Sequence, residues 1–247
     1  MPQNLENNNS PAADSPFVTA AGGITLPLNE KLSDGTKINV KNERAWSWDY
    51  LYGYFDKHNL ASTSEGLANY FVGDGGGFSK FFTTPNYQND VSGVNTFSSI
   101  DYWKTTNAAE TGVTQVNPPV NSHGTGTGRN VPDLALNADP ETGYAVYYST
   151  AQNQSATWVN QYGGTSFVAP QLNGVSAVLN SGRHDRIGFW NPQIYHFAQS
   201  SNSPFTALNS TTDNNNLYYT SQGNTVYNQA TGLGTVDFNK LNSAFSK

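Results

Sequence analysis

Apolar residues in the first part of the chain gather in short runs that end at glycines or turns. Residues 17–21 read Phe-Val-Thr-Ala-Ala and are followed by Gly22 and Gly23, which predicts a buried strand with a tight exit. Residues 1–15 are polar and rich in Asn, so we expect a flexible N-terminal tail or loop there. The aromatic stretch from Trp46 to Phe55 predicts a short helix or strand.

The middle of the chain alternates between polar segments and aromatic ones. Residues 89–130 are rich in Thr, Asn, Gly and Pro and predict long surface loops. Residues 144–150 predict a strand that is entered from a turn, and a second strand is expected around 157–159.

The clearest helix of the sequence follows these strands. Apolar residues from Phe167 to Leu179 predict a buried helix that is closed by Gly182. Pro170 is expected in its first turn, where a missing N–H is tolerated. After residue 183 the pattern predicts loops and short strands.

Composition excludes several functional classes. Charged residues make up only 12% of the chain and the net charge is -6, without a basic cluster, so nucleic acid is excluded as a partner. The chain has no Cys, and hence neither disulfides nor a thiolate metal site. No apolar run approaches the roughly 20 residues that span a bilayer, and residues 1–16 do not form a signal peptide.

The strongest candidate for chemistry is Ser166, at the predicted start of the helix. Gly163 and Gly164 permit an abrupt turn and leave room for a substrate against the backbone, and Thr165 follows them. The unpaired N–H groups of a helix N-terminus favour an anion, which is the setting that a nucleophilic serine needs. The alternative is that Ser166 is an ordinary N-cap residue.

The segment around Ser166 resembles the nucleophile motif that subtilisins and sedolisins share. Five further segments match the sedolisin pattern in its order, from about residue 11 to 240: Ser15–Leu26, Glu43-x-x-Trp46, Gly75–Gln88, Gly128–Tyr144 and Thr231–Gly234. The chain therefore resembles a sedolisin, a serine-carboxyl peptidase of the subtilisin-like clan. The resemblance implies an α/β fold with a parallel central sheet, of which residues 16–247 would be the C-terminal part, with an insertion near 47–72.

The resemblance also implies which catalytic groups to expect. Ser166 would be the nucleophile, while Gly163, Gly164 and Thr165 would face the substrate and the oxyanion. The family is understood to use a Glu base, an Asp four residues later, and a separate Asp in a Ser-Gly-Asp context for the oxyanion. All three precede the strand that begins here at Ser15, so we expect them to be absent and the chain alone to be inactive.

Several residues are possible substitutes for the missing groups. Glu30 and Asp34 have the i,i+4 spacing, and Asp74 precedes a glycine as the oxyanion Asp does. We interpret all three as solvated loop carboxylates. His123 lies in a His-Gly-Thr sequence like that of subtilisins, but we interpret it as a solvated loop histidine.

Calcium is the cofactor that the resemblance implies. The family binds it with two Asp side chains and backbone carbonyls, an oxygen cage of the kind that this ion prefers. The matching positions here are Ala207 and Asn228, so we expect that calcium is not bound, unless Asp213 compensates.

The expected function is that of an endopeptidase acting on proteins or peptides at acidic pH, outside the cell. A second chain that carries the N-terminal half or a propeptide is a possible partner, and a membrane is not. Two alternatives remain, a catalytically dead homologue and a polysaccharide-binding β-rich module, which the aromatic and Asn content would also suit.

Overall fold

The computed structural model describes residues 6–7, 11–60, 72–105, 113–149, 151–152, 154–214 and 219–246. The strands are β1 Glu6–Asn7, β2 Ala21–Thr25, β3 Leu28–Lys31, β4 Lys37–Val40, β5 Arg44–Ala45, β6 Gly77–Ser79, β7 Thr96–Thr105, β8 Val113–Thr125, β9 Asn130–Val131, β10 Leu134–Asn137, β11 Tyr144–Tyr148, β12 Thr157–Tyr162, β13 Phe205–Thr206 and β14 Thr235–Val236. The helices are α1 Pro11–Asp14, α2 Tyr52–Lys57, α4 Thr165–Asn180, α5 Asn191–Ala198 and α6 Phe238–Ala244, with 3-10 turns η1 Trp48–Leu51, η2 Asn86–Gln88 and η3 Pro140–Thr142.

A small mixed sheet, in the order β10-β2-β5, lies at the centre of the molecule. Strands β10 and β2 are parallel, with Leu134 opposite Ala21 and Asn137 opposite Ile24, whereas β5 is antiparallel to β2. A second small sheet joins β1, β6 and β9. The expected α/β character is thus present, while the parallel pairings in the described part of the chain are limited to β10 with β2 and β1 with β6.

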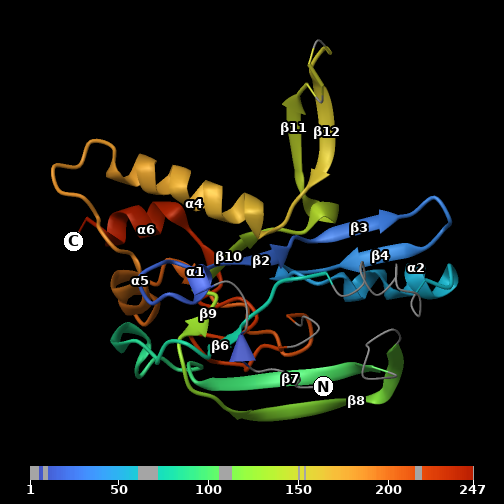
Figure 1. The fold of residues 1–247 in the computed structure, drawn as a ribbon, viewed down its shortest axis with the longest axis horizontal. Helices are drawn as coiled ribbons and strands as arrows, with labels where there is room; N and C mark the ends of the chain where they lie inside the picture. Colours follow the sequence, from blue (N-terminus) through green and yellow to red (C-terminus); the bar gives the residue numbers. More distant parts are fainter. Residues whose placement is uncertain are drawn as a thin grey trace.

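The main hydrophobic core lies between the central strands and three helices. Leu134 and Ala138 from the β10 region pack in it with Val168 and Leu172 of α4 and Ile194 of α5. Figure 1 shows α4 and α6 along one side of β10 and β2, and the β7–β8 hairpin on the opposite side. Because α4 contributes only Val168, Leu172 and Leu179 to the buried residues, one face is covered and the other is exposed, in contrast to the buried helix that we expected.

The first central strand differs from its prediction. The structure begins β2 at Ala21 and continues it through the two glycines, while Phe17 is 80% exposed. A Cβ on Gly22 would approach Pro132 Cγ to 2.6 Å, and one on Gly23 would approach Ala138 Cβ to 2.7 Å. The glycines therefore do not end a strand but allow its neighbours to pack against it.

The prediction of long surface loops over residues 89–130 is wrong. Strands β7 and β8 form a long antiparallel hairpin within this range. The glycines that suggested loops are needed for packing, since a Cβ on Gly124 would lie 2.6 Å from the ring of Phe97. The two strands are paired by hydrogen bonds between backbone groups, which a polar, Thr-rich sequence can also form. The pattern of side chains therefore did not indicate this hairpin.

Helices replace the predicted irregular structure at both ends of the chain. In the segment 1–15, where we expected a tail or loop, β1 and α1 are formed and Asp14 is buried. After residue 183, α5 begins with a Pro in its first turn, and α6 is capped by Asp237, whose side chain accepts from the N–H groups of Asn239 and Lys240. The aromatic stretch from Trp46 to Phe55 is helical, as η1 and α2. None of the helices in the described ranges is both long and apolar enough to cross a membrane.

Candidate functional site

The turn that carries Ser166 is held against residues 138–140. The N–H of Gly164 donates to the carbonyl of Ala138 at 2.5 Å, and a Cβ on Gly163 would collide with that carbonyl and with Pro140 N, 2.6 Å away. Gly164 has φ 86° and ψ 158°, which an L side chain rarely adopts. Both positions therefore require glycine.

Ser166 is not an N-cap. Helix α4 begins at Thr165, its cap is Gly164, and no side chain caps it. The Ser166 side chain is exposed, and its Oγ lies 3.9 Å from where a Cβ of Gly164 would be. We find no hydrogen bond from this hydroxyl to another described residue. The N-cap alternative is therefore wrong. Of the first N–H groups of α4, that of Phe167 donates to the Gly164 carbonyl at 2.9 Å, which leaves those of Thr165 and Ser166 beside an unengaged hydroxyl.

Pro170 lies inside α4, and the prediction that it falls in the first turn is wrong. Proline lacks the N–H that would donate to the carbonyl four residues earlier, which is that of Ser166. The Ser166 carbonyl therefore has no regular helical partner, and the first turn of α4 is held less firmly than an ordinary one.

Asp139 anchors the turn on which the Ser166 loop rests. Its buried carboxylate accepts from Thr25 Oγ1 at 2.6 Å, Trp48 Nε1 at 2.8 Å and Tyr50 OH at 2.7 Å. Burial, followed by the charge of Asp139, raises the pKa of Tyr50 well above its usual value. The fixed carboxylate positions Ala138 and Pro140, and through them Gly163 and Gly164.

A buried ion pair between Arg129 and Asp133 stabilises the region where the chain enters β2. Arg129 Nη2 lies 2.6 Å from Asp133 Oδ2, and both side chains are fully buried. Burial acts to lower the pKa of Arg129, but the charge of Asp133 raises it overall. Asp133 also accepts from the N–H of Ala20 at 2.6 Å and from Tyr195 OH at 2.8 Å.

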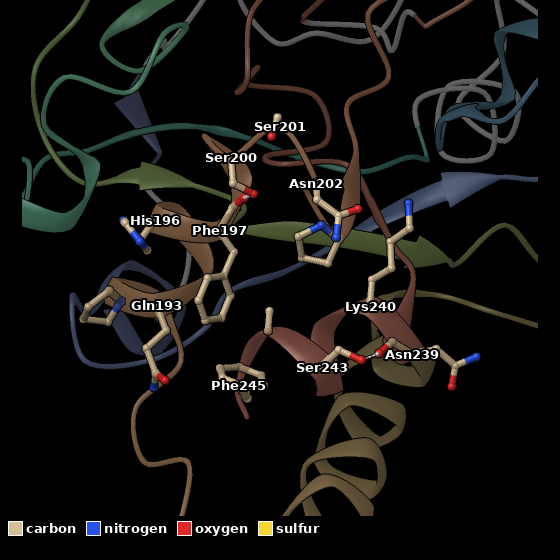
Figure 2. A pocket seen from close by; sticks show the side chains of 13 residues that line it. Gln193, His196, Phe197, Ser200, Ser201, Asn202, Asn239, Lys240, Ser243 and Phe245 are labelled. Atoms are coloured by element: carbon tan, nitrogen blue, oxygen red, sulfur yellow. Dashed lines mark hydrogen bonds between the residues drawn. The ribbon is translucent and has the colours of Figure 1, made fainter. Parts of the chain in front are cut away.

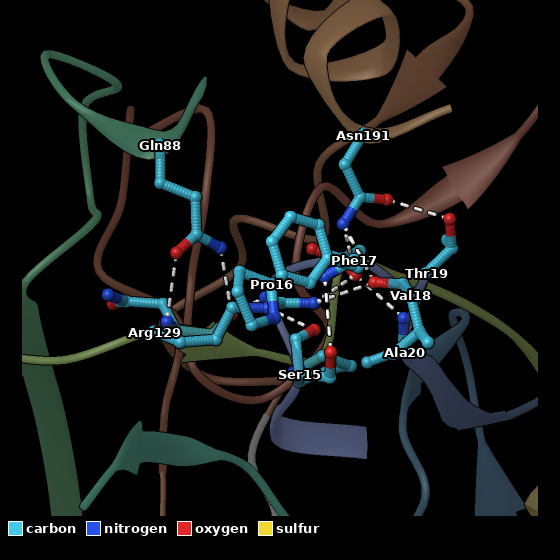
Figure 3. A network of polar contacts seen from close by, with 12 residues as sticks. Ser15, Pro16, Phe17, Val18, Thr19, Ala20, Gln88, Arg129 and Asn191 are labelled. Atoms are coloured by element: carbon cyan, nitrogen blue, oxygen red, sulfur yellow. Dashed lines mark hydrogen bonds and ion pairs between the residues drawn. The ribbon is translucent and has the colours of Figure 1, made fainter. Parts of the chain in front are cut away.

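The same groups bind the backbone of residues 15–20. Arg129 donates to the carbonyls of Ser15 and Val18, and Asn191 Nδ2 donates to that of Val18 at 2.9 Å (Figure 3). We call Arg129, Asp133, Asn191 and Tyr195 the Arg129 network. It fixes the chain where it enters β2, and β2 in turn pairs with β10, which leads to Asp139.

Gln161 is a strained residue that the sequence did not reveal. It has φ 63° in β12, shortly before Gly163. Such left-handed backbone in a residue other than Gly or Asn costs on the order of 1–2 kcal/mol. Sequence carries no signal for it, because Gln has no preference for this conformation.

The other possible substitutes for the missing catalytic groups have no hydrogen bond to Ser166 in the described structure. Asp34 lies in the β3–β4 turn, where the N–H of Thr36 and contacts with His58 and Lys57 lower the pKa of its carboxyl. Glu30 is in β3, so its spacing to Asp34 is not that of one helix face. His123 is exposed as we expected but lies in β8 rather than in a loop, with Nδ1 2.8 Å from Ser98 Oγ.

Asp74 is buried, which contradicts its interpretation as a solvated carboxylate. Burial raises the pKa of Asp74 to about 8, although backbone N–H groups of Gly23 and Gly75 act to lower it. Its Oδ2 faces the side of β2 where a Gly22 Cβ would point, whereas the Gly23 side meets Ala138 and Trp46, which belong to the core of α4. Asp74 and α4 therefore lie on opposite faces of β2.

The residues at the expected calcium positions do not fit the ion. Asn228 Oδ1 already accepts from the N–H groups of Ala230 and Thr231 at 3.0 and 2.9 Å, and Ala207 has no ligand atom in its side chain. Asn214 Nδ2 donates to the carbonyl of Leu208 at 2.5 Å. Asp213 is exposed and accepts from Asn42. Within the described ranges no group of acidic, His or Cys side chains could hold a metal ion.

Two grooves of the described structure differ in their position relative to Ser166. A groove of about 910 Å³ lies between α5 and α6, with Phe197 and Phe245 in its lining and His196 and Lys240 at its sides (Figure 2). A smaller groove of about 300 Å³ follows α4 and is lined by Ala169 and Leu172 together with Val18. Of the two, only the smaller one borders the helix of Ser166.

Comparison with known proteins supports the resemblance to sedolisins. No protein-family model matches the chain. It is 29% identical over 236 residues to tripeptidyl-peptidase SED1 of Arthroderma otae, in an alignment covering 93% of this chain and 29% of the relative. It is 28% identical over 225 residues to kumamolisin of a Bacillus species, covering 91% and 30%. Xanthomonalisin of a Xanthomonas species is 26% identical over 238 residues, covering 95% and 22%.

The chain is similar to three sedolisins. It spans less than a third of the length of each of these relatives. The matches extend over more than nine tenths of the chain, so the polysaccharide-binding alternative is not favoured. The three relatives are serine peptidases, of the class that the motif order had indicated.

Proposed function

We propose that Ser166 is the nucleophile of a sedolisin-type endopeptidase. The observation that carries this proposal is the exposed Ser166 hydroxyl in the first turn of α4, on a loop that only glycines can form. The similarity to sedolisins, which are serine peptidases, supports it. Gly163, Gly164 and Thr165 would border the substrate backbone.

In this mechanism Ser166 Oγ attacks the scissile carbonyl carbon while a carboxylate base takes its proton. The free N–H groups at the start of α4 stabilise the negative charge that develops on the carbonyl oxygen. The C–N bond breaks, the amine leaves with a proton, and water hydrolyses the acyl-enzyme. A carboxylate stays basic where His would be protonated, so we propose an acidic pH for the reaction and an extracellular setting.

We propose further that this chain alone has little or no activity. No described carboxylate or imidazole is hydrogen-bonded to the Ser166 hydroxyl, and a serine without a base is a poor nucleophile. A Glu and an Asp spaced by four, and an Asp in a Ser-Gly-Asp context, would come from another polypeptide segment. Protein or peptide is the proposed substrate, and calcium is not a proposed cofactor.

The experiment compares the purified chain with its Ser166→Ala variant in cleavage of a denatured protein at acidic pH. No cleavage that depends on Ser166 is expected from the chain alone. Robust cleavage lost in Ser166→Ala would refute the proposed inactivity and support the nucleophile.

A second step tests the nucleophile itself. The DNA upstream of the Met1 codon is read for a frame that encodes Glu-x-x-x-Asp and Ser-Gly-Asp, and the longer protein is expressed with and without Ser166→Ala. Cleavage that survives the substitution would refute the role of Ser166. If no such frame exists, a catalytically dead homologue is the better description, a reading that the unfit calcium positions also favour.

A further inference from the structure

The β11–β12 hairpin stands out from the body of the molecule beside the start of α4 (Figure 1). Its strands are antiparallel, and β12 leads directly into the Gly163–Ser166 turn. A protruding element joined to the candidate nucleophile is well placed to contact whatever approaches that serine.

Two large aromatic side chains face each other across this hairpin without cover. Tyr147 is paired with Trp158 in the strand register, their ring centroids are 5.3 Å apart, and they are 59% and 66% exposed. Each ring offers a large apolar area that gains free energy when it is buried. A contiguous exposed aromatic patch on a soluble protein indicates an interaction site.

The lack of charged side chains in the hairpin limits the classes of ligand that it can bind. From Gly143 to Gly182 the sequence has no Asp, Glu, Lys, Arg or His, so the hairpin and all of α4 lack charged side chains. The carboxyl of Glu141 reaches Gln161 at the base of the hairpin, but the strands that carry Tyr147 and Trp158 have no charged side chain, so contact with apolar groups selects the ligand at these two rings. The two rings are inclined at 52°, which forms a wedge for a side chain rather than one flat platform for a sugar ring.

The base of the hairpin is fixed to the residue next to Ser166. The ring of Tyr144 stacks on that of Phe167 at 5.4 Å and 7°, and Tyr162 contacts the same ring at 5.7 Å. The hydroxyls of Tyr148 and Tyr162 are hydrogen-bonded across the strands. The aromatic pair is therefore held in a defined relation to Ser166.

We propose that Tyr147 and Trp158 bind an apolar side chain of the polypeptide substrate, several residues away from the bond at Ser166. This rests on the proposed function. The strand from Trp158 to Tyr162 covers roughly 13 Å at about 3.3 Å per residue, and an extended substrate has a similar rise. The pair is therefore separated from the base of the hairpin by the length of several extended substrate residues.

The test measures binding separately from cleavage. The Ser166→Ala chain is titrated with a fluorescein-labelled neutral peptide that has Leu and Phe at its centre, and Kd is read from fluorescence anisotropy. Tyr147→Thr with Trp158→Thr should raise Kd about tenfold or more. Thr favours strands, so this double variant keeps the hairpin, which circular dichroism verifies.

The controls decide between the outcomes. Phe81→Thr removes another exposed aromatic, 63% accessible, and should leave Kd unchanged. A peptide with Ser in place of Leu and Phe should bind about tenfold more weakly. The proposal would be overturned if the double variant bound the peptide as tightly as the Ser166→Ala chain does, or if the Ser166→Ala chain did not bind it at all. It would also be overturned if a neutral oligosaccharide competed as well as the unlabelled peptide. Because Ser166 is absent from this assay, an inactive chain does not affect the result.

Discussion

The Arg129 network and the uncharged segment from Gly143 to Gly182 differ in both burial and charge. The network is buried, holds a full ion pair and binds three separate parts of the chain, residues 15–20, 129–133 and 191–195. The uncharged segment carries exposed Tyr147, Trp158 and Val178 and holds Ser166 by its glycines. The segment around Ser166 can leave large apolar side chains exposed because the buried Arg129 network stabilises the fold elsewhere.

Breaking the ion pair is expected to have the largest effect. Arg129→Met leaves Asp133 charged, buried and without its cation, which should lower the free energy of unfolding by about 3–5 kcal/mol. Urea denaturation followed by circular dichroism measures it. The control is Lys57→Met, because Lys57 pairs with Asp34 at the exposed surface and should cost less than about 1 kcal/mol. Equal effects of the two substitutions would contradict the contrast between buried and exposed pairs.

Asp74 is a buried carboxyl whose pKa is raised by burial. Its pKa of about 8 in the folded chain lies above the ordinary value of 3.8, so the folded state keeps a proton that the unfolded state releases. Stability should therefore be full below about pH 4 and fall as the pH rises to about 8, by at most about 1.4 kcal/mol per unit. Asp74→Asn should flatten this dependence in urea denaturation at a series of pH values. A slope that is unchanged in the variant would assign the dependence to other groups.

The strain at Gln161 gives a smaller effect of opposite sign. Gln161→Gly should raise the free energy of unfolding by about 0.5–1 kcal/mol, because Gly adopts positive φ freely. The neighbouring Asn160→Gly is the matched control. It should destabilise the strand by a similar amount, since Gly gains nothing there. Stabilisation by both would show that the strand, and not the left-handed residue, determines the result.

Ser166→Ala should have the smallest effect on stability, within about 0.5 kcal/mol, because its hydroxyl neither caps α4 nor is buried. Ser47→Ala is the comparison, since Ser47 Oγ accepts from the N–H of Asp49 and caps η1, and its loss should cost about 1 kcal/mol. Thermal unfolding of both variants measures the difference. A loss in Ser166→Ala as large as in Ser47→Ala would point to a structural serine.

Local signals in the sequence were sufficient for the elements around Ser166. The strand predicted at residues 144–150 is β11, the one around 157–159 is β12, and the helix from Phe167 to Leu179 lies within α4. Aromatic and β-branched runs, and an apolar segment closed near Gly182, are effects of neighbouring residues. The position of Ser166 at the start of a helix followed from the same pattern.

Contacts between distant segments could not be predicted in this way. Asp74 is buried partly because Gly22, far from it in sequence, has no side chain in the space of the carboxylate. Residues 17–20 are bound by Arg129 and Asn191 instead of forming a strand. Asp139 stood in a recognised motif, but its role as the anchor of the Ser166 loop depends on Thr25, Trp48 and Tyr50.

The composition of the segment from Gly143 to Gly182 has a consequence for titration experiments. Its only ionisable side chains are tyrosines, and the hydrogen bond with Tyr148 raises the pKa of Tyr162 above its usual value. The segment itself therefore adds no carboxylate or imidazole to a titration, whereas Glu141, whose pKa is raised by burial, contacts it through Gln161. A pH profile recorded at Ser166 in a Glu141→Gln variant would therefore report the group that activates the serine without a contribution from this neighbouring carboxyl.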